Sequence, residues 1–98
     1  MPIDFTNEKH ERLSISERTF MALDSSQDVL EQKTGIRIDQ YGRTVLYPNH
    51  AKLWLLSIQD FIAVAKNLAP SVKTECSMLI KYLHSCIEQK TAVFINGE

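Results

Sequence analysis

Histidines and cysteines are the residues whose spacing would most readily reveal a chemical site. His10, His50 and His84 lie far apart in the chain, and none belongs to a His-x-x-x-His pattern or to a closely spaced cysteine pair. Cys76 and Cys86 are expected on one helix, where ten residues span roughly 15 Å, too far for a disulfide. The sequence therefore predicts neither a metal centre nor a disulfide.

Local motifs of common enzyme sites are also absent from the sequence. There is no glycine-rich phosphate loop and no Gly-x-Ser-x-Gly elbow. A dyad of Cys86 with His84 is disfavoured, because residues two apart on a helix point in different directions. We therefore expect a non-catalytic protein that needs no cofactor. A small enzyme, with groups that converge only in the fold, is the minority hypothesis.

Length and charge narrow the class of protein further. The 98 residues make a single domain, 1–98, with one hydrophobic core, and the net charge of −1 is unlike that of a general nucleic-acid or membrane-surface binder. Residues 1–35 carry seven acidic and four basic side chains, whereas residues 36–98 carry five acidic and seven basic ones. This asymmetry is either chance or an acidic face for a basic partner.

Nothing in the sequence indicates secretion or membrane insertion. The first residues lack the basic region and apolar run of a leader, and the most apolar stretch is interrupted by Lys52, Gln59, Asp60 and Lys66. Unpaired cysteines suit a reducing compartment. We expect a cytoplasmic protein.

A partner-binding surface is expected on the acidic N-terminal helices and on a turn that follows them. The segment Asp39–Gly42 has aspartate at the first and glycine at the fourth position of a turn, with an aromatic side chain between them. Tyrosine is common at protein interfaces, although a solvated turn residue would look the same. The candidate partner-binding residues are Asp24, Asp28, Glu31, Arg37, Asp39, Tyr41 and Arg43.

Short helices are predicted to carry the acidic residues of this surface. Ser14 and Glu17 have the spacing of a capping box, which predicts a helix to about residue 24, and a second such signal begins at Ser25. These signals fit two helices or one continuous helix. Gly35 is expected to end the helical region in a left-handed conformation.

The segment from 36 to 47 alternates apolar and polar residues around its turn and is predicted to be a β-hairpin. A hairpin needs further strands or a helix to be stable. Residues 92–95 are the best candidate for a third strand. Residues 3–5 are the next candidate, as a short edge strand or merely a tail.

Two long helices are predicted to complete the fold. Residues 48–68 form a helix with Asn49 as a plausible cap, and the helix is apolar on nearly all sides, with Trp54 in its main stripe. Residues from Ser71 onward form a second helix with its own apolar stripe. A short loop favours an antiparallel pair. The fold class expected is α+β: short N-terminal helices, a β-hairpin in a small antiparallel sheet, and two long antiparallel C-terminal helices.

One alternative reassigns residues 27–46 to a helix-turn-helix with Gly35 at its turn, which would make the protein a small DNA-binding regulator. Its second helix would span 37–46, would contain Tyr41-Gly42 in mid-helix, and would offer only Arg37 and Arg43 as bases. The hairpin is the preferred interpretation, and nucleic acid is not the expected partner.

The run from Thr34 to His50, with its Thr-Gly-Ile-x-Ile-Asp-x-Tyr-Gly-x-Thr-x-Leu-x-Pro-x-His pattern, resembles a segment of small bacterial immunity proteins. These proteins accompany contact-dependent inhibition and related polymorphic toxins, and the similarity covers residues 30–60. The resemblance implies a cytosolic antitoxin that binds one cognate toxin domain, often a nuclease, in a one-to-one complex. It supplies no catalytic residues, and because folds in this family are diverse it does not fix the fold.

Overall fold

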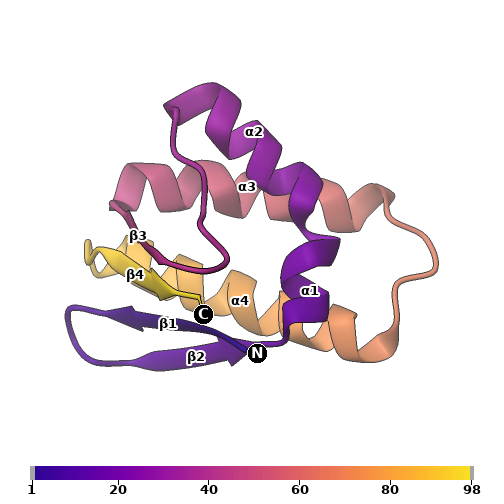
Figure 1. Cartoon of the computed structure of the whole chain (residues 1–98), viewed down its shortest axis with the longest axis horizontal. Coiled ribbons are helices and arrows are strands. Elements are labelled where there is room, and N and C mark those ends of the chain that lie inside the picture. The colour runs from indigo at the N-terminus through magenta and orange to yellow at the C-terminus, as the bar shows by residue number, and fades with distance from the viewer. Residues whose placement is uncertain (1, 98) are drawn as a thin grey trace.

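The fold, described here for residues 2–97 from a computed structural model, places four helices on one side of an antiparallel sheet (Figure 1). The α+β class expected from the sequence is confirmed. The elements in chain order are β1 (Ile3–Asn7), β2 (Arg12–Ile15), α1 (Glu17–Ala22), α2 (Asp24–Thr34), β3 (Arg43–Leu46), α3 (Pro48–Val64), α4 (Pro70–Glu88) and β4 (Val93–Asn96).

The sheet has the strand order β2-β1-β4-β3, and all neighbouring strands are antiparallel. Residues 3–5 do form a strand, but β1 is central in the sheet and not the expected edge. Residues 92–95 correspond to β4, which is the other central strand and pairs with both β1 and β3.

Strand β2 was not expected, because Ser14 looked like a helix cap. Ser14 instead lies opposite Asp4 in the sheet and donates a hydrogen bond to its carboxylate. The cap of α1 is Ser16, whose Oγ accepts a hydrogen bond from the Thr19 backbone N–H at 3.2 Å. The chain therefore stays extended two residues longer than the capping-box pattern indicated.

The predicted hairpin over 36–47 is wrong in its first half. Residues 36–39 are irregular, and β3 pairs with β4 instead of with them. The turn itself is present: the Tyr41 N–H donates to Asp39 Oδ1 at 2.9 Å, and the Gly42 N–H approaches Asp39 O at 3.4 Å. The helix over 37–46 that the DNA-binding alternative requires is also absent, since Arg43–Leu46 is a strand.

The helical part follows the sequence more closely. Gly35 ends α2 with φ of +77°, as expected. Helices α3 and α4 each begin with proline at the first turn and have no side-chain cap, so Asn49 and Ser71 do not serve as caps. Helix α3 stops at Val64, earlier than the predicted residue 68.

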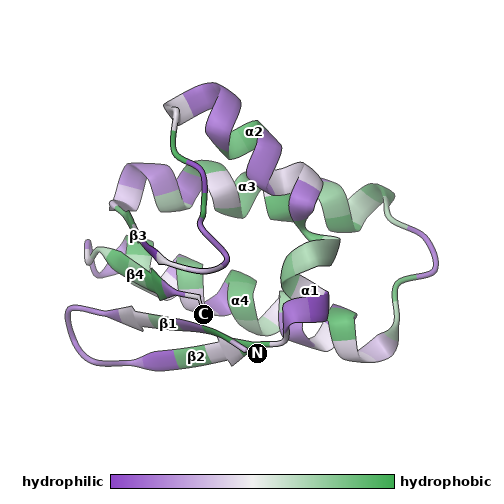
Figure 2. Cartoon of the chain, in the orientation of Figure 1, coloured by the Kyte–Doolittle hydropathy of each residue, from purple (hydrophilic) through white to green (hydrophobic). Residues whose placement is uncertain are grey.

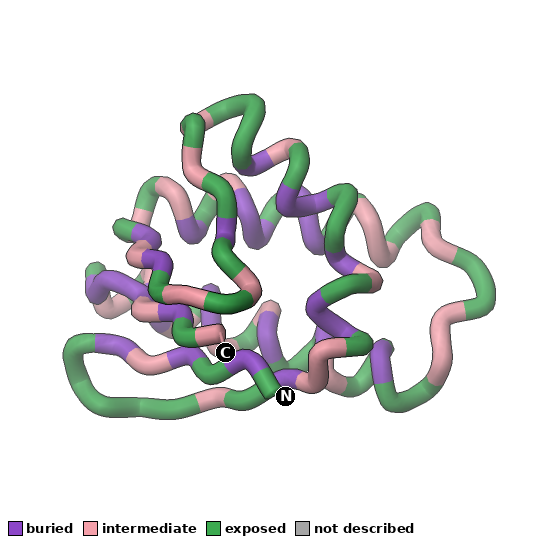
Figure 3. Tube along the Cα trace, viewed as in Figure 1, coloured by how far each residue is buried: buried purple, intermediate pink, exposed green. Residues whose placement is uncertain are grey.

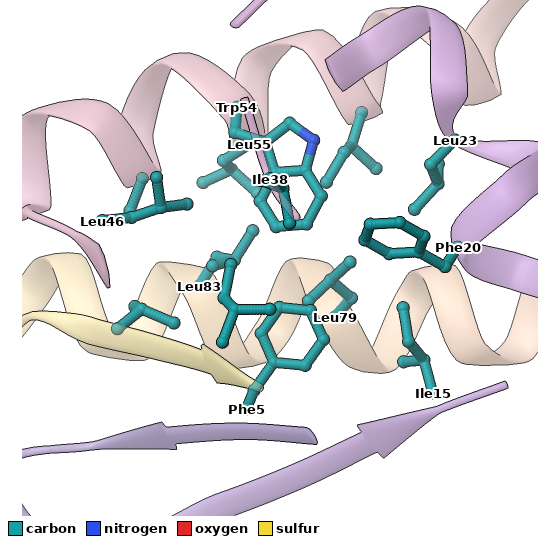
Figure 4. Packing of buried hydrophobic residues seen from close by; sticks show 14 of the residues in the cluster. Phe5, Ile15, Phe20, Leu23, Ile38, Leu46, Trp54, Leu55, Leu79 and Leu83 are labelled. Carbon is teal, nitrogen blue, oxygen red and sulfur yellow. The ribbon is translucent and has the colours of Figure 1, made fainter. Parts of the chain in front are cut away.

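The core lies between the sheet and the helices, where Figure 4 shows its side chains, and Figure 2 shows apolar residues recurring along α3 and α4. Trp54 of α3 is fully buried and stacks on Phe5 of β1, with ring centroids 6.1 Å apart. The Trp54 indole N–H donates to Ser26 Oγ at 3.1 Å, which ties α3 to α2. Trp54 is therefore a core residue, as the apolar stripe predicted.

Helix α3 packs between α2 and α4 and also reaches the sheet through Trp54. Helix α2 covers part of the second apolar side of α3. Leu53 is half-buried there, whereas Leu56 and Val64 stay 48% and 76% exposed. Figure 3 shows buried and exposed positions following one another along the trace of α3.

Candidate functional site

Three of the predicted acidic residues form one ridge along α2. Asp24, Asp28 and Glu31 follow each other at spacings of four and three, which places them on the same face of the helix. All three are exposed. We call this set of three carboxylates the acidic ridge.

Arg37 folds back over the acidic ridge and pairs with all three carboxylates. Its Nη1 lies 2.5 Å from Asp28 Oδ1 and 3.1 Å from Glu31 Oε1, and its Nη2 lies 3.2 Å from Asp24 Oδ1. The hydrogen bonds that Arg37 donates to the Asp28 and Glu31 carboxylates raise the pKa of its guanidinium, so it stays charged. One positive charge against three negative ones leaves the face acidic.

Gly35 and Ile38 explain why Arg37 reaches this position. The left-handed Gly35 reverses the chain at the end of α2, and Ile38 then inserts into the core, where it is 3% exposed. Figure 4 shows Ile38 among the apolar side chains of the core. With Ile38 directed inward, its neighbour Arg37 points outward onto the ridge.

A groove lies between this returning segment and the junction of α1 with α2. It has a volume of about 620 Å³. Its lining residues are Phe20, Met21, Asp24, Gln27, Arg37, Ile38, Asp39, Gln40 and Tyr41. We call it the α1–α2 groove. Phe20, Ile38 and Gln27 are buried at its base, whereas Met21 and Tyr41 are 61% and 72% exposed.

The turn that closes one end of the groove is held from three directions. Gln40 Nε2 donates to Glu17 Oε1 of α1 at 2.9 Å, and the Asp39 N–H donates to Thr44 Oγ1 at 3.0 Å. The Gly97 N–H donates to Gly42 O at 2.8 Å. The turn is therefore part of the folded framework, which keeps Tyr41 at the groove.

The structure thus brings together six of the seven predicted site residues. Asp24, Arg37, Asp39 and Tyr41 line the groove, and Asp28 and Glu31 join it through Arg37. Arg43 is separate: it lies at the start of β3, opposite Asn96, on the sheet face that no helix covers. Arg43 therefore lies outside the cluster that the other six residues form.

Sequence reasoning missed three residues of the groove: Met21 of α1, Gln27 of α2 and Gln40 of the turn. Met21 had a usable signal, because it follows the inward-facing Phe20 on a short helix and so faces outward. Gln27 gave no comparable signal. It is buried because its Nε2 donates to Phe20 O at 3.0 Å across the junction between α1 and α2.

The thiols are placed differently from reactive cysteines. Cys76 and Cys86 are both buried and unpaired, and burial raises the pKa of each thiol. Asn7 Nδ2 contacts Cys86 Sγ at 3.5 Å inside the core. A raised pKa disfavours the thiolate, which is the nucleophilic form.

Residues 2–97 contain neither a metal-binding cluster nor a membrane-spanning helix. No group of three histidine, cysteine or acidic side chains there is arranged to hold a metal ion. No helix in this range combines the length and the apolar character needed to cross a membrane.

Comparisons of the chain with protein-family models, with curated proteins and with solved structures find no match.

Proposed function

We propose that this protein is a non-catalytic immunity protein, or antitoxin, that binds and neutralises one cognate bacterial toxin domain in a one-to-one complex. The toxin proposed is a nuclease, and the complex forms in the cytoplasm, where unpaired buried thiols are stable. The observation that carries the proposal is the convergence of the acidic ridge, Asp39 and Tyr41 on one side of the molecule.

The charge of this surface supports a basic partner. A nuclease cleft is basic because it holds phosphates. An acidic surface opposite such a cleft speeds association and disfavours other partners. Arg37 offsets one of the three ridge charges and leaves the rest to attract the partner.

The shape and rigidity of the surface also support protein binding. Tyr41 and Met21 present exposed apolar area beside the carboxylates, and aromatic and methionine side chains are enriched where proteins meet. Because hydrogen bonds with Thr44, Glu17 and Gly97 fix the backbone of the turn, little conformational entropy is lost when a partner orders Tyr41.

Co-expression with a toxin tests this function. The toxin domain is taken from an open reading frame next to the gene for this chain and is expressed with and without it. Restored growth, together with a one-to-one complex of the purified proteins by light scattering, is the expected result. Growth arrest with no complex, or salt-dependent binding of the chain to duplex DNA in its place, overturns the proposal.

A further inference from the structure

The α1–α2 groove combines three features that select for one kind of side chain. Its base is apolar, with Phe20 and Ile38 buried, and its rim carries the exposed Tyr41 ring and the Met21 thioether. Two carboxylates, Asp24 and Asp39, line the same groove. We propose that the groove receives an arginine side chain from a basic segment of the partner. This rests on the function proposed above, because it assigns the chemistry by which that partner is held.

Arg37 shows that this surface binds a guanidinium. Three carboxylates from successive turns of α2 converge on its two terminal nitrogens, at 2.5 to 3.2 Å. Among residues 2–97, Asp24 makes its hydrogen bond through Oδ1, and Asp39 uses Oδ1 for the Tyr41 N–H. The second oxygen of each carboxylate is therefore left to accept a hydrogen bond from another cation.

The neighbouring groups favour arginine over other cations. A guanidinium is planar and weakly hydrated, so it stacks on an aromatic ring while it pairs with a carboxylate, whereas the lysine ammonium is compact and strongly hydrated. A metal ion is disfavoured because, within residues 2–97, no group of three histidine, cysteine or acidic side chains is arranged to hold one.

The groove is also large enough for an arginine side chain. Its volume of about 620 Å³ falls within the roughly 300–1,000 Å³ of sites that hold small ligands. An arginine side chain with the backbone on either side of it has room there. The aliphatic part of that side chain packs against Met21 and Tyr41, and the guanidinium faces the carboxylates.

Titration of the isotope-labelled full chain with short peptides tests the inference. The probes are N-acetyl-Gly-Arg-Gly-amide and the matching peptides with lysine and with citrulline, which has the shape of arginine without its charge. Saturable shifts of the Met21, Tyr41 and Gly42 backbone amides are expected with the arginine peptide. The lysine peptide should bind more weakly, and the citrulline peptide should give no saturable shift.

Two variants and a control sharpen the experiment. Tyr41→Ala should lower the affinity for the arginine peptide by about two- to five-fold, which is the contribution of an exposed cation–π contact. Asp39→Asn keeps an oxygen for the Tyr41 N–H but removes the charge, and it should weaken binding as well. Asp60→Asn removes the same charge from an exposed position of α3 and should leave the affinity for the arginine peptide unchanged.

Three results overturn the inference: no saturable shift at the groove amides, equal binding of the arginine and citrulline peptides, or equal effects of Asp39→Asn and Asp60→Asn. The outcomes that contradict the antitoxin function are distinct from these. If the groove binds the arginine peptide but the chain restores no growth against the toxin, the antitoxin function fails and the groove assignment stands. If growth is restored but the peptide does not bind, only the groove assignment fails.

Discussion

Arg37 Nη1 donates a hydrogen bond to Asp28 Oδ1 at 2.5 Å, and this contact joins the segment after α2 to the helix that precedes it. The same guanidinium also reaches Asp24 and Glu31. Together with the burial of Ile38, these contacts hold residues 36–38 against α2, so that this segment does not pair with β3 as a hairpin strand. The acidic ridge and the α1–α2 groove both result from this arrangement.

Arg37→Ala should lower the free energy of unfolding only slightly, by about 1 kcal/mol or less, because exposed ion pairs are screened and each contributes little. All members of this cluster are 44% exposed or more. Urea unfolding followed by fluorescence measures the change, since Trp54 is the only tryptophan. Arg43→Ala, which removes the same charge from the sheet, is the control. A loss above about 3 kcal/mol would mean that the cluster holds the fold and is not chiefly a surface feature.

Ser26→Ala should destabilise the fold by about 1–3 kcal/mol, because it leaves the Trp54 indole N–H buried without its acceptor. The same urea titration measures the loss, and the emission of Trp54 should also shift. Ser25→Ala changes an exposed neighbour on the same helix and should have little effect. Equal effects of the two substitutions would contradict the role assigned to this hydrogen bond.

Glu75 of α4 should make stability depend on acid pH. Burial raises the pKa of its carboxyl, but hydrogen bonds from Thr19 and from the Ser16 side chain and backbone outweigh that effect, so the pKa in the folded protein lies below its ordinary value. A lowered folded-state pKa gives stability that is complete above the unfolded-state pKa of about 4.5 and is lost as pH falls through the folded-state value.

Glu75→Gln should therefore be less stable than the wild type at pH 7, and the difference should shrink as the pH drops below about 4.5. Unfolding free energies from urea titrations at several pH values measure this. Glu88→Gln, on the exposed end of α4, provides the control. A stability difference between wild type and Glu75→Gln that stayed constant from pH 7 to pH 3 would contradict the lowered folded-state pKa of Glu75.

Gly97→Ala should disturb the turn at the groove. A Cβ on Gly97 would lie 1.8 Å from Gln40 O, so either the turn or the C-terminal strand must move. We expect the Gly97 N–H to lose its bond to Gly42 O and the amides of Tyr41 and Gly42 to exchange faster with solvent. Asn96→Ala, an exposed neighbour, should leave that exchange unchanged. Unaltered exchange in Gly97→Ala would show that the two segments are not coupled.

The helices and the core were largely predictable because their signals are local. The apolar stripes of α3 and α4, the left-handed Gly35 and the burial of Trp54 all follow from spacing that one helix determines. Exact helix starts were not predictable where proline alone began the helix, as at Pro48 and Pro70.

The sheet and the groove were harder to predict because they depend on contacts between distant segments. Strand β3 alternates as a hairpin strand would, yet its partner is β4, about fifty residues later in the chain. The hairpin prediction failed because the Ile38 side chain gained burial in the core and Arg37 gained three carboxylate partners. The spacing of the acidic ridge was visible in the sequence, whereas the return of Arg37 to it was not.

The most direct test of the central claim is the dissociation constant for the neighbouring toxin domain at several salt concentrations. Asp28→Lys with Glu31→Lys reverses two charges of the acidic ridge, and Asp60→Lys with Glu88→Lys reverses two exposed charges elsewhere. Our account predicts that the ridge variant binds weaker by on the order of ten-fold or more at low salt, while the control variant binds like the wild type. Equal affinities of the ridge variant and the wild type would contradict it.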